Sequence, residues 1–221
     1  MKAEFPIDVL VSKCTCDIQF GNVERPTHRN TGWDEARFEF AAQKWVDVSE
    51  NGYGAAVLND CKYGYDVKES VVRLTLLKSG IFPDPNADKG HHEFIYSLLP
   101  HEGDFREGGV IQEAYKLNRP VYIASTSLAA GTTRSLLSTD KENVFADTIK
   151  LAEDGDGFIL RIHEEYGRRS TVAVDVSALN IDTVIATDLC ERPVADGDFS
   201  FKDGKIHASI KPYEILTFRM K

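Results

Sequence analysis

Alternation of apolar and polar side chains at every second residue is the feature that most constrains what this sequence can fold into. Four segments show it clearly: residues 72–76, 94–98, 158–162 and 172–176. A period of two places successive side chains on opposite faces of an extended chain, so each segment predicts a β-strand with one buried face. The sequence predicts no long helix.

Two other segments carry local signals. FSFKDGKIHASI, residues 199–210, alternates on both sides of Asp203-Gly204. Asp-Gly supplies the positive φ angles of a two-residue turn, so this segment predicts a β-hairpin, and a last strand follows over residues 214–220. In GVIQEAYKLNRP, apolar residues four apart and the nearby Pro120 predict a short helix over about residues 110–118.

These elements predict an all-β fold, a β-sandwich with one short helix. The acidic cluster AEDGDG near residue 155 is typical of a turn and marks the expected domain boundary. We expect a larger domain over residues 1–153 and a small C-terminal β-sandwich over residues 154–221. A unit of about seventy residues buries a poor fraction of its surface, so the small domain must pack on its neighbour.

Charge and composition exclude several classes of partner. The 221 residues include 26 Lys and Arg against 35 Asp and Glu, which gives a formal charge of −9. An acidic chain repels phosphate backbones, so no nucleic-acid partner is expected. No apolar run approaches the roughly 18 residues of a membrane helix, and MKAEFPIDVLVSK lacks the plain apolar core of a signal peptide, so no membrane partner is expected. The cysteines are expected to be buried reduced thiols: Cys14, Cys16, Cys61 and Cys190.

The first polar cluster is ERPTHRNTGWDEARFEF, residues 24–40. It brings His28, Asn30, Trp33 and Asp34 into a short span without a clean period. An aromatic ring stacks on a sugar while amides and carboxylates bind hydroxyls, so the span suits a sugar-binding surface or a domain interface. The alternative is a surface loop anchored by a buried Trp33, and composition alone favours that alternative.

The second cluster is LNDCKYGYD, residues 58–66, in which Asn59, Asp60, Lys62 and Tyr63 follow an apolar strand. Asn, Asp and Gly after a strand are typical of a turn. Asp60 and Lys62 also suit a catalytic pair, but neighbouring opposite charges in turns are mostly solvated.

The third cluster is the loop IFPDPNADKGHH, which holds Asp84, Asp88, Gly90 and His92. By residue type it is the best candidate for a metal or acid–base site, because carboxylates and imidazoles bind zinc or calcium and transfer protons. Its spacing matches no known ligand motif, and two adjacent histidines in an extended chain point to opposite faces. The alternative is a polar turn stiffened by proline.

Four segments in order resemble the C-terminal region of glycoside hydrolase family 38 α-mannosidases, in particular the cytosolic and bacterial branch. They are RPTHRNTGWDEARFEF, QKWVDVSENGYGAAVLNDCKYGYDV, RLTLLKSGIFPDPNADKGHHEFIYSLLPH and GVIQEAYKLNRP. The tail, with ILRIHEEYGRRSTV and KPYEILTFRMK, resembles the last β-sandwich of the same enzymes. The resemblance covers nearly the whole chain, and a cytoplasmic location is expected.

The resemblance implies that residues 1–153 are the second part of a galactose-mutarotase-like β-supersandwich. It implies hydrolysis of terminal α-mannosides by a retaining mechanism, in which one carboxylate attacks the anomeric carbon and another protonates the leaving oxygen. The family's zinc ligands and nucleophile belong to a catalytic domain whose motifs are absent here. The chain alone is therefore expected to be inactive and to hold no cofactor. Its expected partners are an α-mannoside glycan and the enzyme's own N-terminal catalytic and helical domains.

Loops of the family's β domains reach the catalytic cleft, so the resemblance also implies candidate substrate contacts. By motif match they are Asp84, Asp88, Gly90, His92, Asn59, Asp60, Lys62, Tyr63, His28, Asn30, Trp33 and Asp34. Packing against the catalytic or helical domain explains the same polar residues equally well.

Two other functions stay open at this stage. A free-standing carbohydrate-binding module would use Trp33, Trp45, Tyr63 and Tyr65 as an exposed stacking platform, although Trp45 lies in an alternating segment that suits a core. An autonomous mutarotase-like enzyme would use a histidine and a carboxylate of the third cluster in acid–base catalysis. Because an incomplete sandwich leaves strand edges unpaired, the isolated chain is expected to form a homo-oligomer.

Overall fold

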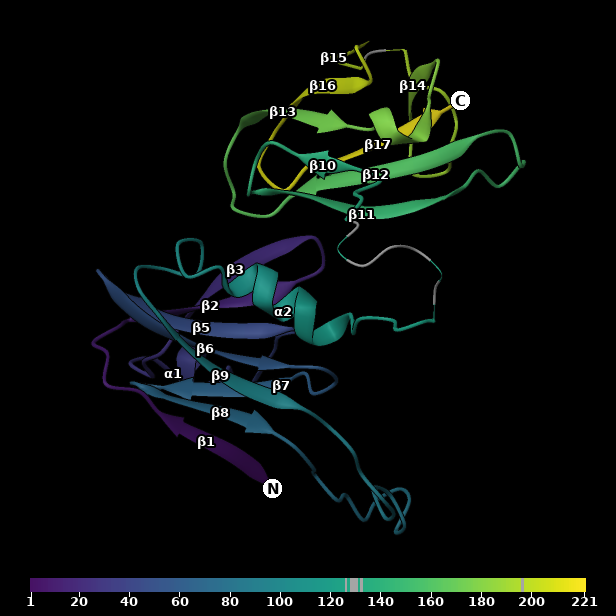
Figure 1. Ribbon diagram of the computed structural model, residues 1–221. Coiled ribbons are helices and arrows are strands. Elements are labelled where there is room, and N and C mark those ends of the chain that lie inside the picture. The colour runs from purple at the N-terminus through teal and green to yellow at the C-terminus, as the bar shows by residue number, and fades with distance from the viewer. Residues whose placement is uncertain (126, 128–130, 132, 196) are drawn as a thin grey trace. The chain divides into compact units, whose positions relative to one another are not determined.

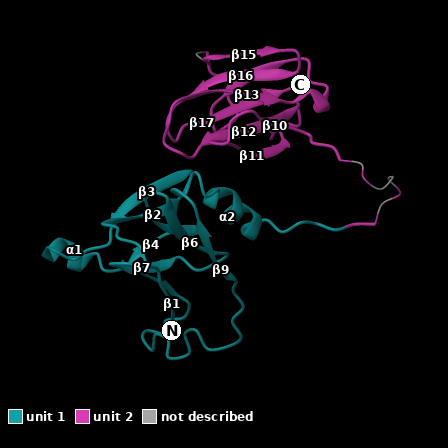
Figure 2. Cartoon of the chain, turned by 60° about the vertical axis from the view of Figure 1, so that its left-hand side comes forward, with its two compact units in different colours: residues 1–123 teal, residues 124–221 magenta. Residues whose placement is uncertain are grey.

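The computed structural model describes residues 1–125, 127, 131, 133–195 and 197–221. The chain divides into two compact units, residues 1–123 and 124–221, each with its own hydrophobic core (Figure 2). The described residues form four antiparallel sheets and little helix (Figure 1), so the predicted all-β class is confirmed. In the part of the chain that the structure describes, no helix is long and apolar enough to cross a membrane.

The boundary between the units differs from the expected one at residue 153. Strands β10 (Ser138–Thr139) and β11 (Val144–Leu151) belong to the second unit, because they pair with β13 (Ser170–Asp175) and β12 (Phe158–Glu164). The acidic AEDGDG segment is the turn that joins β11 to β12 within one sheet. Glycine and aspartate are common in hairpin turns as well as in linkers. The composition that predicted a domain boundary here therefore belongs to a turn inside unit 2.

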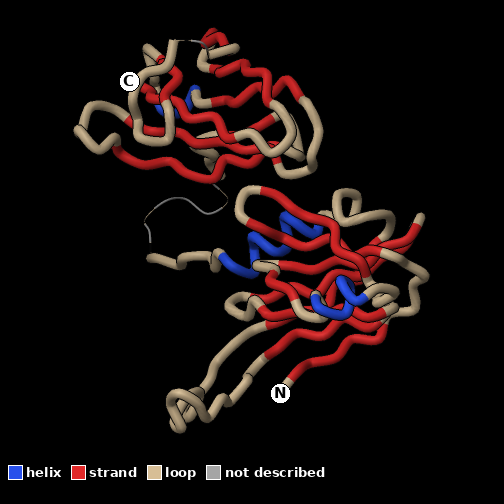
Figure 3. Tube along the Cα trace, turned by 180° about the vertical axis from the view of Figure 1, so that it is seen from behind, coloured by secondary structure: helices blue, strands red, loops and turns tan. Residues whose placement is uncertain are grey.

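Unit 1 is a sandwich of two antiparallel sheets, with strand orders β1-β8-β7-β4 and β3-β2-β5-β6-β9. The first sheet consists of β1 (Lys2–Pro6), β8 (Val71–Thr75), β7 (Gly64–Lys68) and β4 (Phe40–Ala41). The second consists of β3 (Gly21–Pro26), β2 (Lys13–Ile18), β5 (Trp45–Glu50), β6 (Tyr53–Asn59) and β9 (Tyr96–His101). Long loops connect some of these strands, above all the one between β8 and β9 (Figure 3).

The core of unit 1 follows the alternation in the sequence. Val72 and Leu74 are fully buried, as their period of two predicts. Helix α2 (Val110–Asn118) forms where the sequence predicts it and packs its buried residues against β5 and β6. Trp45 is fully buried and stacks on Phe105 with ring centroids 5.1 Å apart, so it belongs to the core. A second helix, α1 (Gly32–Ala36), was not predicted.

Unit 2 is a smaller sandwich whose sheets have the orders β10-β13-β16-β15 and β11-β12-β17-β14. Its remaining elements are η1 (Ser177–Leu179), β14 (Val184–Thr187), β15 (Phe199–Lys202), β16 (Lys205–Ile210) and β17 (Ile215–Met220). The predicted hairpin is β15–β16, and its turn residues Asp203 and Gly204 have φ angles of 51° and 71°. The inward side chains of β13, β16 and β17 form the core.

Two expectations about burial are wrong. The segment around β9 was expected to bury one face, but Tyr96 and Leu98 are 41% and 46% exposed, because β9 lies at the edge of its sheet. The cysteines were expected to be buried, but only Cys14 and Cys16 are, whereas Cys61 and Cys190 lie in exposed turns; all four are free thiols.

Candidate functional site

The first candidate cluster forms helix α1 and the segment before it. Thr31 is the N-cap: its Oγ1 accepts a hydrogen bond from the Asp34 amide at 3.2 Å, and Asp34 Oδ2 accepts one from the Thr31 amide at 3.1 Å. The Thr31 hydroxyl also donates to Asp34 Oδ2 at 2.9 Å, and this bond and the one from the Thr31 amide lower the pKa of Asp34. His28 Nδ1 lies 3.6 Å from Asp34 Oδ2, and Asn30 is exposed just before the cap. Trp33 is 77% exposed, so the expected buried anchor is wrong.

A hollow of about 210 Å³ lies beside this helix, and its lining includes His28, Asp34, Arg29 and Arg37. Glu24 and Glu39 also line the hollow, so both carboxylates and cationic side chains surround it. Such a mixed set of charged donors and acceptors can bind hydroxyl groups.

The second cluster is a turn organised by Asn59, which is 1% exposed. Its Nδ2 donates to the Gln43 carbonyl oxygen at 2.7 Å and to Tyr65 Oη at 2.5 Å, and its Oδ1 accepts from the Lys62 amide at 2.6 Å. A buried amide with its polar atoms engaged fixes the turn, because leaving any of them unpaired would cost free energy. Asn59 therefore positions its neighbours and does not itself face solvent.

Asp60 and Lys62 contact the segment that leads into β9. Asp60 Oδ1 accepts from the Ile95 amide at 3.0 Å, and Lys62 Nζ lies 4.9 Å from the centre of the Phe94 ring. Burial acts to raise the pKa of Asp60, but hydrogen bonds from Cys61 and the Ile95 amide outweigh it and lower the pKa overall. Tyr63 is exposed beside them. The structure thus brings the second cluster against Phe94 and Ile95, which follow the third cluster in the sequence.

The third cluster is an exposed loop held by its own hydrogen bonds. Asp88 Oδ2 accepts from the Ser79 amide at 2.8 Å, and His92 Nε2 lies 2.8 Å from the Asp88 carbonyl oxygen. Asp84 Oδ1 accepts from the amide two residues later at 2.9 Å. Gly90 has a φ of 141°, a conformation that favours glycine. Asp88 and His92 are therefore brought together, whereas Asp84 serves a local turn.

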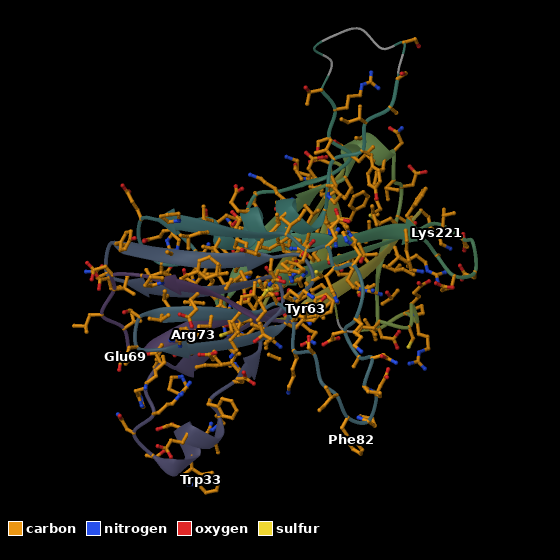
Figure 4. The ribbon with its side chains drawn as sticks, turned by 90° about the horizontal axis from the view of Figure 1, so that it is seen from below. Trp33, Tyr63, Glu69, Arg73, Phe82 and Lys221 are labelled. Atoms are coloured by element: carbon orange, nitrogen blue, oxygen red, sulfur yellow. The ribbon has the colours of Figure 1, made fainter. Side chains whose placement is uncertain are left out.

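Figure 4 shows how the three clusters are spread over unit 1. Trp33 lies at the tip of one protrusion and Phe82 at the tip of another, and Tyr63 lies closer to the sheets. The first cluster is therefore separate from the third, and the twelve candidate residues do not form one cleft. Of the four rings expected for a stacking platform, Trp45 and Tyr65 are fully buried, which argues against that platform.

Two buried charge groups in unit 1 were not predicted. Asp66 is 5% exposed and binds Lys2 Nζ at 2.5 Å and Arg73 Nη1 at 3.0 Å. Lys2, Asp66 and Arg73 lie on strands β1, β7 and β8 of one sheet. The sequence signal for this group is the polar face of each alternating segment. Asp47 and His101 form the second group, with Oδ1 and Nε2 2.7 Å apart. Burial acts to lower the pKa of His101, but the hydrogen bond to Asp47 raises it overall.

The family resemblance associates zinc with catalysis, and the donor set of the described residues does not fit it. Among the described residues, no three His, Cys, Asp or Glu side chains come together in an arrangement that could hold a metal ion. The third cluster, the best candidate by residue type, uses its carboxylates to order the loop backbone.

The fold places the protein among all-β proteins with two β-sandwich units, and comparisons with known proteins identify it further. Residues 1–86 match the glycosyl hydrolases family 38 C-terminal domain, and residues 143–218 match the glycosyl hydrolases family 38 C-terminal beta sandwich domain. The chain belongs to glycosyl hydrolase family 38 and represents its C-terminal region.

Relatives and solved structures agree with this assignment. The chain is 42% identical to human alpha-mannosidase 2C1 over 221 residues, which covers 98% of the chain and 21% of the relative. It is 42% identical to alpha-mannosidase G of Dictyostelium discoideum over 92% of the chain and 19% of the relative. The crystal structure of an alpha-mannosidase from Enterococcus faecalis V583 shares the fold, with a TM-score of 0.81 at 19% identity. The match covers the whole of this chain and 25% of the Enterococcus chain. The chain thus spans about a fifth of the curated relatives that it matches.

Proposed function

We propose that this chain is the non-catalytic C-terminal portion of an α-mannosidase that hydrolyses terminal α-mannosides of glycans. In this proposal it scaffolds the catalytic domain and contributes loops to the substrate cleft. The observation that carries the proposal is the match of almost the whole chain to one fifth of human alpha-mannosidase 2C1 at 42% identity. A retaining glycosidase needs two carboxylates about 5 Å apart, and we place that pair, with the zinc, in the rest of the enzyme.

The loop around Asp88 and His92 is the part of this chain best suited to contact a sugar. His92 Nε2 faces a carbonyl oxygen, so it must donate, and a neutral ring then keeps Nδ1 as an acceptor. Both side chains are exposed, although the Asp88 hydrogen bond to Ser79 orders the loop. An ordered loop loses less conformational entropy when it binds a ligand than a flexible loop does. We propose that the exposed imidazole accepts a hydrogen bond from a sugar hydroxyl.

The partners and location in this proposal are an α-mannoside glycan, the enzyme's own catalytic and helical domains, and the cytoplasm. The resemblance to the cytosolic branch supports the location. A homo-oligomer of the isolated chain stays a prediction.

A chimera tests the proposed function. In it, this chain replaces the matched C-terminal region of human alpha-mannosidase 2C1. We expect the chimera to hydrolyse an aryl α-mannoside and this chain alone to be inactive. We expect His92→Ala to raise the KM of the chimera by about tenfold, equivalent to about 1.4 kcal/mol, with a smaller change in kcat. Lys89→Ala removes another exposed side chain of the same loop and serves as the control.

Two results would contradict the proposed function. Turnover by this chain alone would show that it carries its own catalytic groups. A folded chimera without activity would show that the chain does not serve an α-mannosidase in the proposed way. If His92→Ala and Lys89→Ala give the same KM, the loop does not contact the substrate and the scaffold role alone remains.

A further inference from the structure

Unit 2 contains a pocket of about 580 Å³ that the proposed function does not use. Residues of β13, β15 and β16 line it from one sheet of the sandwich, and residues of β14 and β17 line it from the other. Strands β15 and β14 are the last strands of their sheets (Figure 1), so the pocket opens at the edge of the sandwich. We call it the edge pocket, and its chemistry depends on Arg169, Asp198, Phe199, Lys211, Glu214 and Phe218.

The most deeply buried residues of the edge pocket are apolar. Phe218 and Ile210 are 2% and 1% exposed. The Phe218 ring packs against the ring of Phe199, which is only partly buried, with centroids 5.2 Å apart. Gly197 also lines the pocket, and a Cβ there would lie 2.8 Å from Phe199 Cδ1, so a larger residue would crowd this ring. The pocket therefore has an apolar base that includes aromatic rings.

Four charged side chains line the same pocket, two of each sign. Glu214 Oε2 accepts a hydrogen bond from the Lys211 amide at 2.7 Å, which fixes the position of this carboxylate. Arg169 and Asp198 are exposed, and within the described part of the chain neither side chain makes a hydrogen bond or an ion pair. Donors and acceptors that the fold itself does not use thus surround the apolar base.

This combination fits an uncharged ligand that carries many hydroxyl groups. The carboxylates of Asp198 and Glu214 would repel a phosphate, and the cations Arg169 and Lys211 would repel a metal ion. An entirely apolar ligand would take these four groups out of water without giving them partners. A hexopyranose has hydroxyls that donate to carboxylates and accept from cations, and its C–H face is apolar. Pockets with an apolar lining and a few polar groups that fix orientation are typical of small-molecule sites.

We infer that the edge pocket binds a neutral hexopyranose unit of a glycan. Asp198 and Glu214 accept hydrogen bonds from its hydroxyls, Arg169 and Lys211 donate to them, and Phe199 packs against its C–H face. The pocket volume lies within the range of about 300–1,000 Å³ that small-molecule sites have. The site goes beyond the proposed function, because the twelve candidate residues all belong to unit 1 and the edge pocket belongs to unit 2. It gives a glycan with several sugar units a second point of attachment.

An NMR titration of this chain alone tests the inference. Methyl α-mannoside or methyl α-glucoside at millimolar concentration is expected to shift the amide signals of Ser209 and Lys211 in a saturable way, whereas inorganic phosphate is not. Asp198→Ala removes an exposed carboxylate without a structural bond, so the fold is expected to stay intact and the sugar affinity to fall at least about tenfold. Asp182→Ala removes an exposed carboxylate of the same unit outside the pocket and is the matched control.

Each outcome decides the inference. Unchanged spectra with both sugars would overturn it, and so would shifts confined to unit 1, which would place sugar binding at loops such as the one with His92. Phosphate that shifts the Ser209 and Lys211 signals while the sugars do not would make the pocket an anion site. Equal sugar affinities of Asp198→Ala and Asp182→Ala would show that the sugar binds elsewhere. Because the titration needs no catalytic domain, its failure leaves the proposed function untouched, and an inactive chimera contradicts only that function.

Discussion

Glu164 offers the sharpest test of how unit 2 is held together. Its side chain is fully buried and accepts four hydrogen bonds: from the Tyr166 and Gly167 amides at 2.9 Å, from the Tyr213 amide at 3.0 Å and from Asn143 Nδ2 at 2.8 Å. These donors lie in three different connections, before β11, after β12 and before β17. One carboxylate therefore ties three loops at one end of the sandwich.

The substitution Glu164→Gln keeps the size of the side chain and replaces one oxygen by an NH₂ group. The amide then faces the Gly167 and Tyr213 donors, so two charge-assisted hydrogen bonds are lost. At about 1.5–3 kcal/mol for each bond, the free energy of unfolding falls by about 3–6 kcal/mol. With a urea dependence of about 2 kcal/mol/M for a domain of this size, the midpoint falls by roughly 1.5–3 M.

Two probes separate the units in this experiment. Both tryptophans lie in unit 1, so tryptophan fluorescence follows unit 1, whereas far-UV circular dichroism follows both units. We expect Glu164→Gln to shift a circular-dichroism transition and to leave the fluorescence transition in place. Glu153→Gln, at a side chain that is 83% exposed, is the control and is expected to change stability by less than about 1 kcal/mol. An unchanged circular-dichroism midpoint for Glu164→Gln would refute the reasoning.

Three further predictions concern other parts of the chain. Because the pKa of His101 is raised in the folded state, protonated His101 stabilises unit 1 fully below the ordinary pKa of about 6.5. This stabilisation is lost as the pH rises through the raised pKa, so the urea midpoint followed by fluorescence should fall in that pH range. Asp47→Asn should flatten this pH profile. Asp66→Ala leaves two partly buried cations without their carboxylate and should cost about 1–3 kcal/mol by the same assay. Gly204→Ala places a Cβ at a φ of 71° and 2.8 Å from Ser177 Cβ, so it should destabilise unit 2 by about 1–3 kcal/mol by circular dichroism.

Each of these has a clear contrary result. A pH profile that is the same in the wild type and in Asp47→Asn would mean that the pair with His101 adds nothing to stability. An Asp66→Ala midpoint equal to that of a surface control such as Glu24→Ala would place the Asp66 cluster among weak surface ion pairs. If Gly204→Ala is neutral, strain at the turn is smaller than the geometry indicates.

Much of the fold was predictable because it depends on local chemistry. Local sequence predicted the strand around Val72 and Leu74 and the hairpin turn at Asp203-Gly204, and the structure confirms both. Helix α1 was missed because five residues are too few for a periodic signal, although Thr31 and Asp34 have the spacing of a capping box. The exposure of Leu98 was not predictable, since a strand's pattern states which face points inward but not whether anything covers it.

The candidate residues divide in the same way. Sequence patterns found the polar loops, but the chemistry of each residue depends on partners far away along the chain. An asparagine in a typical turn is exposed, but Asn59 bonds to Gln43 and Tyr65 and is buried. The pair of Asp47 and His101 joins residues 54 positions apart, and neither lies in a motif. Such contacts follow from strand order and register, which local patterns do not determine.

The ordered loops of unit 1 do not form a substrate cleft by themselves. The loops are held by internal hydrogen bonds but face outward on separate protrusions, so a cleft needs walls that this chain does not supply. Strand β9 exposes Tyr96 and Leu98 at the edge of its sheet, and exposed apolar side chains on an edge strand are costly in water.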